Sequence, residues 1–106
     1  MRTALIVGVA GTQLSRDEAA FLKDARPGGV ILFARNLKDH AQIRALIADV
    51  RAAVGADDLL VLIDQEGGRV QRLRPPLGRA LPPAAAFVTL YARDHAAAVI
   101  AAFEAT

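Results

Sequence analysis

Apolar and polar positions along the chain follow two different periods. Residues 4–9, 30–33 and 59–63 form short, almost continuously apolar runs, and helical spacing of apolar residues follows the first two. The third run has no polar alternation, so we expect both of its faces to be buried. Short links between strands and helices predict parallel strands joined by right-handed crossovers, and therefore an α/β fold.

Local signals set the helix boundaries. Ser15 and Glu18 have the spacing of a capping box and predict a helix to about Asp24, ending before Pro27 and Gly28. Its apolar face is expected to hold Ala19, Phe21 and Leu22.

A second helix is predicted over 40–54. Asp39 and Gln42 mark its start, and Gly55 is expected to end it. The spacing i, i+3, i+4, i+7 predicts one buried face made of Ile43, Leu46, Ile47 and Val50.

The C-terminal third follows a different pattern. Prolines in 73–83 remove backbone donors and predict a loop, and the alanine-rich stretch from 84 or 87 to 105 predicts one helix. Three parallel strands make a small sheet whose third strand has an unpaired edge. We therefore expect the chain to form part of a larger fold.

Composition excludes several classes of protein. The 106 residues are 54% hydrophobic and 23% charged, which is typical of a globular chain, and no apolar run approaches the ~20 residues of a membrane span. The net charge is only +2 and the basic residues are scattered among acidic ones, so nucleic-acid binding is not expected. The absence of cysteine is compatible with the cytoplasm. Residues 4–10 after Arg2 could be read as part of a secretory signal, but the helix start at Ser15 favours a strand there.

The most informative chemistry follows the third apolar run. Asp64 and Glu66 stand where a parallel strand ends, which is where α/β enzymes place reacting groups. Extended i, i+2 spacing puts two such groups roughly 6.5–7 Å apart, near the lower limit for the carboxylates of an inverting glycosidase. In the alternative interpretation they cap the Gly67-Gly68 turn or pair with Arg69 and Arg72. On spacing alone both interpretations remain open.

Other kinds of site have little support. The Gly67-Gly68 pair lacks the G-x-G-x-x-G and G-K-[ST] patterns of nucleotide sites. His40 and His95 lie far apart in separate helical segments and are predicted to be surface residues. The sequence therefore predicts no metal site.

Three segments resemble one enzyme family. They are GVILFARN at 29–36, IDQEGGRVQRL at 63–73 and LPP at 81–83. Together they are similar to the amino-terminal part of glycoside hydrolase family 3, and within it most similar to bacterial β-N-acetylhexosaminidases of cell-wall recycling. The resemblance covers nearly the whole chain, so 1–106 is interpreted as the amino-terminal part of a family 3 barrel domain.

The resemblance implies a fold and a chemistry. It implies an incomplete TIM-type (β/α)8 barrel, of which this chain supplies the first three βα units. It also implies a cytoplasmic enzyme that removes terminal N-acetylglucosamine from peptidoglycan fragments by a retaining mechanism without a cofactor. By the same resemblance, Asp64 and Arg72 bind hydroxyls of the sugar, while Glu66 and the glycines shape the loop.

The resemblance does not extend to the family's catalytic residues. The family's K-H-F-P-G-H-G-type segment, with its acid/base histidine, and the later aspartate nucleophile have no counterpart in these residues. We therefore expect no catalytic residue here and no turnover by this chain alone. In the alternative hypothesis the chain is a non-catalytic βαβ module whose third-strand edge binds a complementary chain.

Overall fold

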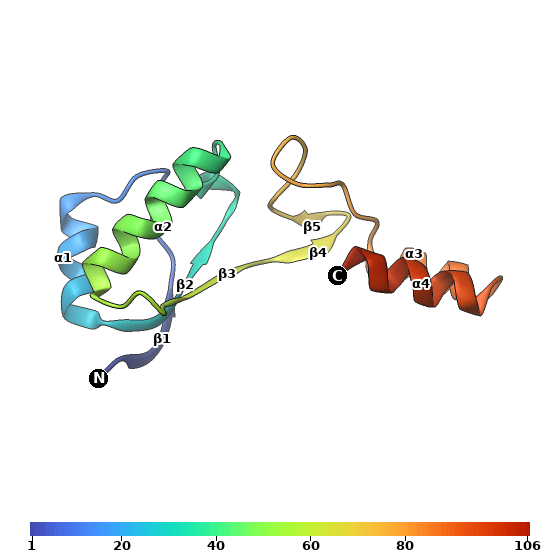
Figure 1. Ribbon diagram of the computed structural model, residues 1–106, viewed down its shortest axis with the longest axis horizontal. Coiled ribbons are helices and arrows are strands. Elements are labelled where there is room, and N and C mark those ends of the chain that lie inside the picture. The colour runs from blue at the N-terminus through green and yellow to red at the C-terminus, as the bar shows by residue number, and fades with distance from the viewer. The chain divides into compact units, whose positions relative to one another are not determined.

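Three parallel strands, which lie in the sheet in the same order as in the sequence, form the sheet predicted from the apolar runs. The computed structural model describes residues 1–106 as two units, Met1–Asp64 and Gln65–Thr106. The first unit contains β1 (Thr3–Val7), α1 (Arg16–Ala25), β2 (Pro27–Leu32), a 3-10 turn (Ala34–Asn36), α2 (His40–Val54) and β3 (Leu60–Ile63) (Figure 1). The α/β class predicted from the sequence is confirmed.

The predicted helix ends are confirmed. The Ser15 side chain accepts a hydrogen bond from the backbone N–H of Glu18, and the Glu18 carboxylate accepts one from the N–H of Ser15. Asp39 caps α2 by accepting from the N–H of Gln42, and Gly55 ends that helix with φ 73°. These local bonds satisfy backbone donors that each helix leaves without an internal partner.

β2 begins earlier than the sequence predicts. We expected a strand from Val30, whereas the structure starts it at Pro27. Proline is acceptable as the first residue of a strand because no ladder donor is needed there. Gly29 is needed further along, since an added Cβ would lie 3.1 Å from Leu62 Cδ1 and 3.3 Å from Leu60 Cβ. The glycine lets β3 side chains cross over β2.

One face of the sheet carries the core. Helices α1 and α2 lie side by side and pack on it (Figure 1). The buried apolar cluster comprises Val9, Leu22, Val30, Leu32, Leu46, Val50, Val54 and Leu59, with Ile43 and Ile47 packed against it. The predicted face of α2 is therefore confirmed. In α1 only Leu22 is buried and Phe21 is 54% exposed, so Phe21 was wrongly assigned to the core.

The expectation that both faces of β3 are buried is wrong. Leu60 is 62% exposed and Leu62 is also exposed, whereas Val61 packs against the core. On β1, Leu5 and Ile6 are exposed as well. Both helices of this unit cover the same side of the sheet (Figure 1), so the side chains of β3 that point to the other side are exposed.

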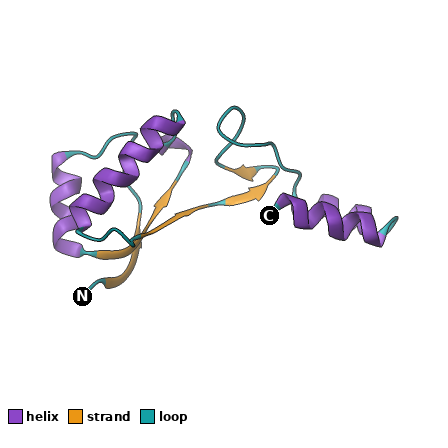
Figure 2. Cartoon of the chain, viewed as in Figure 1, coloured by secondary structure: helices purple, strands orange, loops and turns teal.

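The second unit begins with a hairpin that the sequence analysis did not predict. Strands β4 (Gln65–Gly67) and β5 (Val70–Gln71) pair antiparallel, and the helices α3 (Ala84–Tyr91) and α4 (His95–Ala105) follow (Figure 2). One continuous helix was expected over 84–105, and this was wrong. Asp94 starts a new helix by accepting a hydrogen bond from the N–H of Ala97 at 2.9 Å. No helix of the chain is both long and apolar enough to cross a membrane.

Candidate functional site

The carboxyl edge of the three-stranded sheet is built by a polar network. Asn36 is fully buried, and its amide donates to the carbonyl oxygens of Val9 at 3.0 Å and Gly11 at 2.8 Å. Its Oδ1 accepts from the N–H of Phe33 at 2.8 Å. A single side chain thus joins the segments that follow β1 and β2 at this edge.

Arg35 reinforces the same edge. Its Nε donates to the Val9 carbonyl at 3.2 Å, and its guanidinium lies 4.6 Å from the centroid of the Phe33 ring. An added Cβ on Gly8 would lie 3.3 Å from that ring, so the glycine makes room for it. In the sequence, Arg35 and Asn36 stood out only as part of the family segment 29–36, and their bonds to Val9 were not predicted because that residue is 26 and 27 positions away.

Asp64 lies at this edge, as the sequence predicted. It follows Ile63, the last residue of β3, which pairs with Leu32 at the end of β2. Asp64 is half-buried and is the last residue of the first unit. The carboxyl ends of parallel strands are where α/β enzymes bind their ligands.

Glu66, Arg69 and Arg72 all belong to the β4-β5 hairpin region of the second unit. Glu66 and Arg69 are exposed, whereas Arg72 is half-buried directly after β5. Asp64 and Glu66 therefore lie in different units, and the hypothesis that they form a catalytic pair gains no support from the fold.

The hairpin turn is held by the segment 81–83. Gly67 and Gly68 have φ values of 85° and 57°, a region that favours glycine. The N–H of Gly68 donates to the Leu81 carbonyl at 2.8 Å. An added Cβ would collide with the Pro82 carbonyl oxygen at position 67, and would lie 2.8 Å from Pro83 Cβ at position 68. Two segments that the sequence analysis quoted separately thus pack on each other.

Arg74 supplies the remaining donors at this turn. Its Nε donates to the Gln71 carbonyl at 2.9 Å, and its Nη2 donates to the carbonyls of Arg69 at 3.1 Å and Gly68 at 3.4 Å. The backbone of the Gly67-Gly68 turn is therefore bonded by Leu81 and Arg74. Neither carboxylate is needed to cap it.

Two glutamines that the sequence analysis overlooked organise the strand after the turn. Gln65 Oε1 accepts from the backbone N–H groups of Arg72 and Leu73, both at 3.1 Å. Gln71, which is 4% exposed, bonds to Leu73, Arg79 and Leu81 through its amide. Two glutamines flanking a Gly-Gly turn were the available sequence signal, because a glycine pair between short strands is typical of a hairpin.

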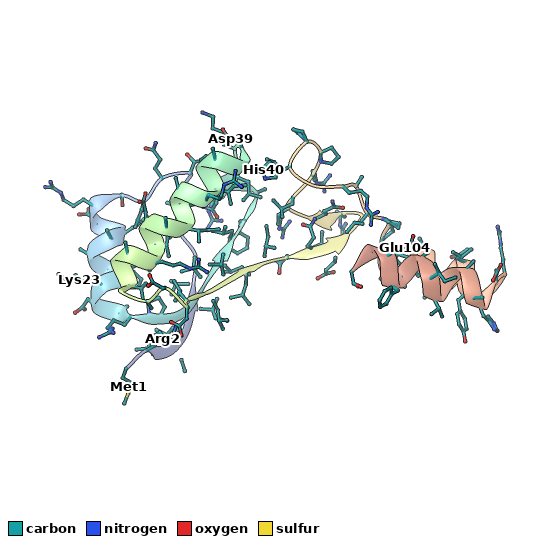
Figure 3. The ribbon with its side chains drawn as sticks, in the orientation of Figure 1. Met1, Arg2, Lys23, Asp39, His40 and Glu104 are labelled. Carbon is teal, nitrogen blue, oxygen red and sulfur yellow. The ribbon has the colours of Figure 1, made fainter.

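The histidines do not form a site. His40 begins α2 beside Asp39 and is exposed (Figure 3). His95 is exposed at the start of α4, where its ring stacks on Tyr91 with centroids 4.1 Å apart. No group of three or more histidine, aspartate or glutamate side chains is arranged to hold a metal ion.

The fold and these segments define a class of protein. The chain belongs to glycoside hydrolase family 3, because the model of the "Glycosyl hydrolase family 3 N terminal domain" matches residues 4–105. The resemblance inferred from the three sequence segments is confirmed.

Curated relatives narrow the comparison to β-hexosaminidases. The chain is 49% identical over 100 residues to a beta-hexosaminidase of Xylella fastidiosa (strain 9a5c), covering 94% of this chain and 29% of that protein. It is 46% identical over 101 residues to a beta-hexosaminidase of Bordetella pertussis, covering 95% of this chain and 28% of that protein. The chain thus spans less than a third of the length of these relatives.

Solved structures support the fold. NagZ from Neisseria gonorrhoeae in complex with N-trifluoroacetyl-D-glucosamine matches with a TM-score of 0.82 and 31% identity, covering 92% of this chain and 29% of that chain. A family 3 beta-N-acetylglucosaminidase from Paenibacillus matches with a TM-score of 0.69 and 32% identity, over 79% of this chain and 16% of that one. The α/β fold with a parallel sheet is therefore that of NagZ over most of this chain, consistent with part of a TIM-type barrel.

Proposed function

We propose that this chain contributes the first part of the sugar-binding site of a β-N-acetylhexosaminidase. The observation that carries the proposal is the position of Asp64, at the carboxyl end of the third parallel strand of a family 3 fold. In the proposed site, the Asp64 carboxylate accepts hydrogen bonds from sugar hydroxyls, and Arg72 donates to them. Charged groups form stronger hydrogen bonds with hydroxyls than neutral groups do.

The proposed reaction is retaining hydrolysis of a terminal N-acetylglucosamine from peptidoglycan fragments in the cytoplasm. It is supported by the similarity to β-hexosaminidases and by a NagZ relative whose structure contains an N-acetylglucosamine analogue. Such hydrolysis requires a nucleophile and an acid/base on either side of the glycosidic bond. The described residues supply binding groups, and the reacting groups belong to the remainder of a (β/α)8 barrel.

The exposed apolar surfaces favour a partner that completes the barrel. Leu60 and Leu62 lie exposed on β3, and Phe103 of α4 is 82% exposed. Apolar side chains of this size are usually buried in a folded domain. In a second proposal, these residues form a complete site by binding a complementary chain that carries the rest of the barrel.

Turnover of a chromogenic N-acetylglucosaminide tests this proposal. The 106-residue chain alone is expected to be inactive. A chimera in which it replaces the matched portion of the Xylella fastidiosa enzyme is expected to turn over the substrate. Mixing the chain with the separate remainder of that enzyme tests the complementary-chain hypothesis. Turnover by the chain alone would contradict the proposal, and so would an inactive chimera that folds with the thermal stability of the parent enzyme.

A further inference from the structure

We propose that Gln65 and Gln71 are positioning residues for Arg72. The Gln65 amide bonds the backbone of Arg72 and of Leu73, and the Gln71 amide bonds the carbonyl of Leu73. This inference rests on the proposed role of Arg72 in sugar binding. An arginine that binds sugar hydroxyls requires a backbone held in a fixed position. A displacement of about 1 Å in a binding group can lower activity by about 10²-fold.

The side chain of Gln65, the first residue of β4, forms hydrogen bonds to the backbone that follows β5. Gln65 pairs with Gln71 across the hairpin, and its side chain continues the bonding beyond the last backbone pair. Oε1 accepts from the N–H of Arg72 and from that of Leu73, both at 3.1 Å. Nε2 donates to the Leu73 carbonyl at 3.0 Å. One side chain therefore bonds three backbone groups, namely the N–H of Arg72 and both the N–H and the carbonyl of Leu73.

Gln71 bonds the same Leu73 carbonyl and connects it to residues 79 and 81. Its Nε2 donates to the Leu73 carbonyl at 2.8 Å and to the Arg79 carbonyl at 2.6 Å. Its Oε1 accepts from the N–H of Leu81 at 2.9 Å. Because Gln71 is nearly fully buried, these bonds are shielded from water. The backbone before and after Arg72 is thus tied to the segment that also holds the Gly67-Gly68 turn.

Only an amide can make this set of bonds. A carboxylate at position 71 would place negative oxygens against the carbonyls of Leu73 and Arg79, which now accept from Nε2. At position 65 a carboxylate keeps the acceptor for the N–H groups of Arg72 and Leu73, and its second oxygen would face one carbonyl, that of Leu73, instead of two. The two positions should therefore respond differently to the same change.

The first test measures backbone amide exchange in the 106-residue chain. Gln65→Met should speed exchange at Arg72 and Leu73 by about tenfold or more, since both N–H groups lose their acceptor. Gln71→Met should do the same at Leu81. Gln65→Glu should retain most of the protection at Arg72. Gln13→Met is the matched control, because Gln13 is exposed and lies far along the chain from the hairpin. Equal exchange at Arg72 in the original chain and in Gln65→Met would overturn the proposal.

The second test is a double-mutant cycle in the Xylella chimera. Gln65→Met should lower kcat/KM about tenfold when Arg72 is present, and by less than about twofold when Arg72 is already alanine. Gln13→Met should change neither value. Equal losses in both backgrounds would overturn this inference and leave the proposed function intact. An Arg72→Ala chimera with unchanged kcat/KM would overturn both, because Arg72 would then lie outside the sugar site.

Discussion

The side-chain amides of Gln65 and Gln71 both donate to the carbonyl oxygen of Leu73, at 3.0 and 2.8 Å. This shared acceptor lies one residue after Arg72. The bonds connect a two-stranded hairpin to the loop that follows it, so a segment rich in glycine, arginine and proline has a defined backbone. A sugar site at the end of a parallel strand needs such an ordered loop.

Substitution of Gly67 should destabilise the hairpin more than substitution of other glycines. Gly67→Ala places a Cβ against the Pro82 carbonyl at a φ of 85°, so both strain and collision oppose it. Gly55→Ala has a φ of 73° but open space around the Cβ, and Gly11→Ala has open space and no positive φ. We expect a loss of at least about 2 kcal/mol for Gly67→Ala and of about 1 kcal/mol for Gly55→Ala.

Urea unfolding of the three glycine variants measures this order. Gly11→Ala should leave the free energy of unfolding within about 0.5 kcal/mol of the original chain. If Gly67→Ala proved as mild as Gly11→Ala, the close packing of 81–83 on the turn would be refuted.

Glu18 should make the first helix sensitive to acid. Its carboxylate accepts from the backbone N–H of Ala10 at 2.7 Å and from that of Ser15 at 3.0 Å, and these bonds lower the pKa of Glu18 from its ordinary value of 4.5. A carboxyl whose pKa is lowered by folding stabilises the fold above the unfolded value, and this contribution is lost as the pH falls through the folded value. The loss is therefore expected below about pH 4.5.

Thermal unfolding of Glu18→Gln at two pH values tests this. At pH 7 the variant should have a lower Tm than the original chain, and at pH 3 the difference should shrink. Asp24→Asn is the control, because Asp24 is exposed near the other end of α1. A difference between Glu18→Gln and the original chain that stays constant with pH would contradict the assignment.

A residue on the helix-covered side of the sheet and one on its open side should respond differently to truncation in the 106-residue chain. Leu46 is fully buried in the core and Leu60 is 62% exposed. Leu46→Ala should cost about 2–5 kcal/mol, and Leu60→Ala should change stability by no more than about 0.5 kcal/mol. Chemical denaturation of both variants gives the comparison. A loss at Leu60 equal to that at Leu46 would show that the second face of the sheet is covered in solution.

Local signals in the sequence were sufficient for several elements of the fold. Ser15, Asp39 and Gly55 bond to backbone groups within a few residues, so their spacing alone located the helix ends. The exposure of Leu60 was not predictable in the same way, because it depends on which side of the sheet the helices cover. The break at Asp94 was missed because the alanine-rich composition on both sides favours helix equally.

The candidate site, too, was predictable only where a local signal in the sequence marked it. Asp64 was found because it follows an apolar run directly, and the structure places it at the end of β3. Its role, and that of Arg72, came from a family resemblance and stay predictions. The bonds of Asn36 to Val9 and Gly11 and of Gln71 to Leu81 were not predicted, because these partners lie 25 to 27 and 10 residues away, respectively. Such bonds become visible only after the chain has folded.

The central claim is that Asp64 binds the sugar, and the kcat/KM of the Xylella chimera tests it most directly. Asp64→Ala should lower kcat/KM by about 10²-fold or more, because sugar hydroxyls would be left without an acceptor in the site. Asp24→Ala, at an exposed position of α1, should leave kcat/KM unchanged. A kcat/KM for Asp64→Ala equal to that of Asp24→Ala would contradict the claim and assign Asp64 a structural role.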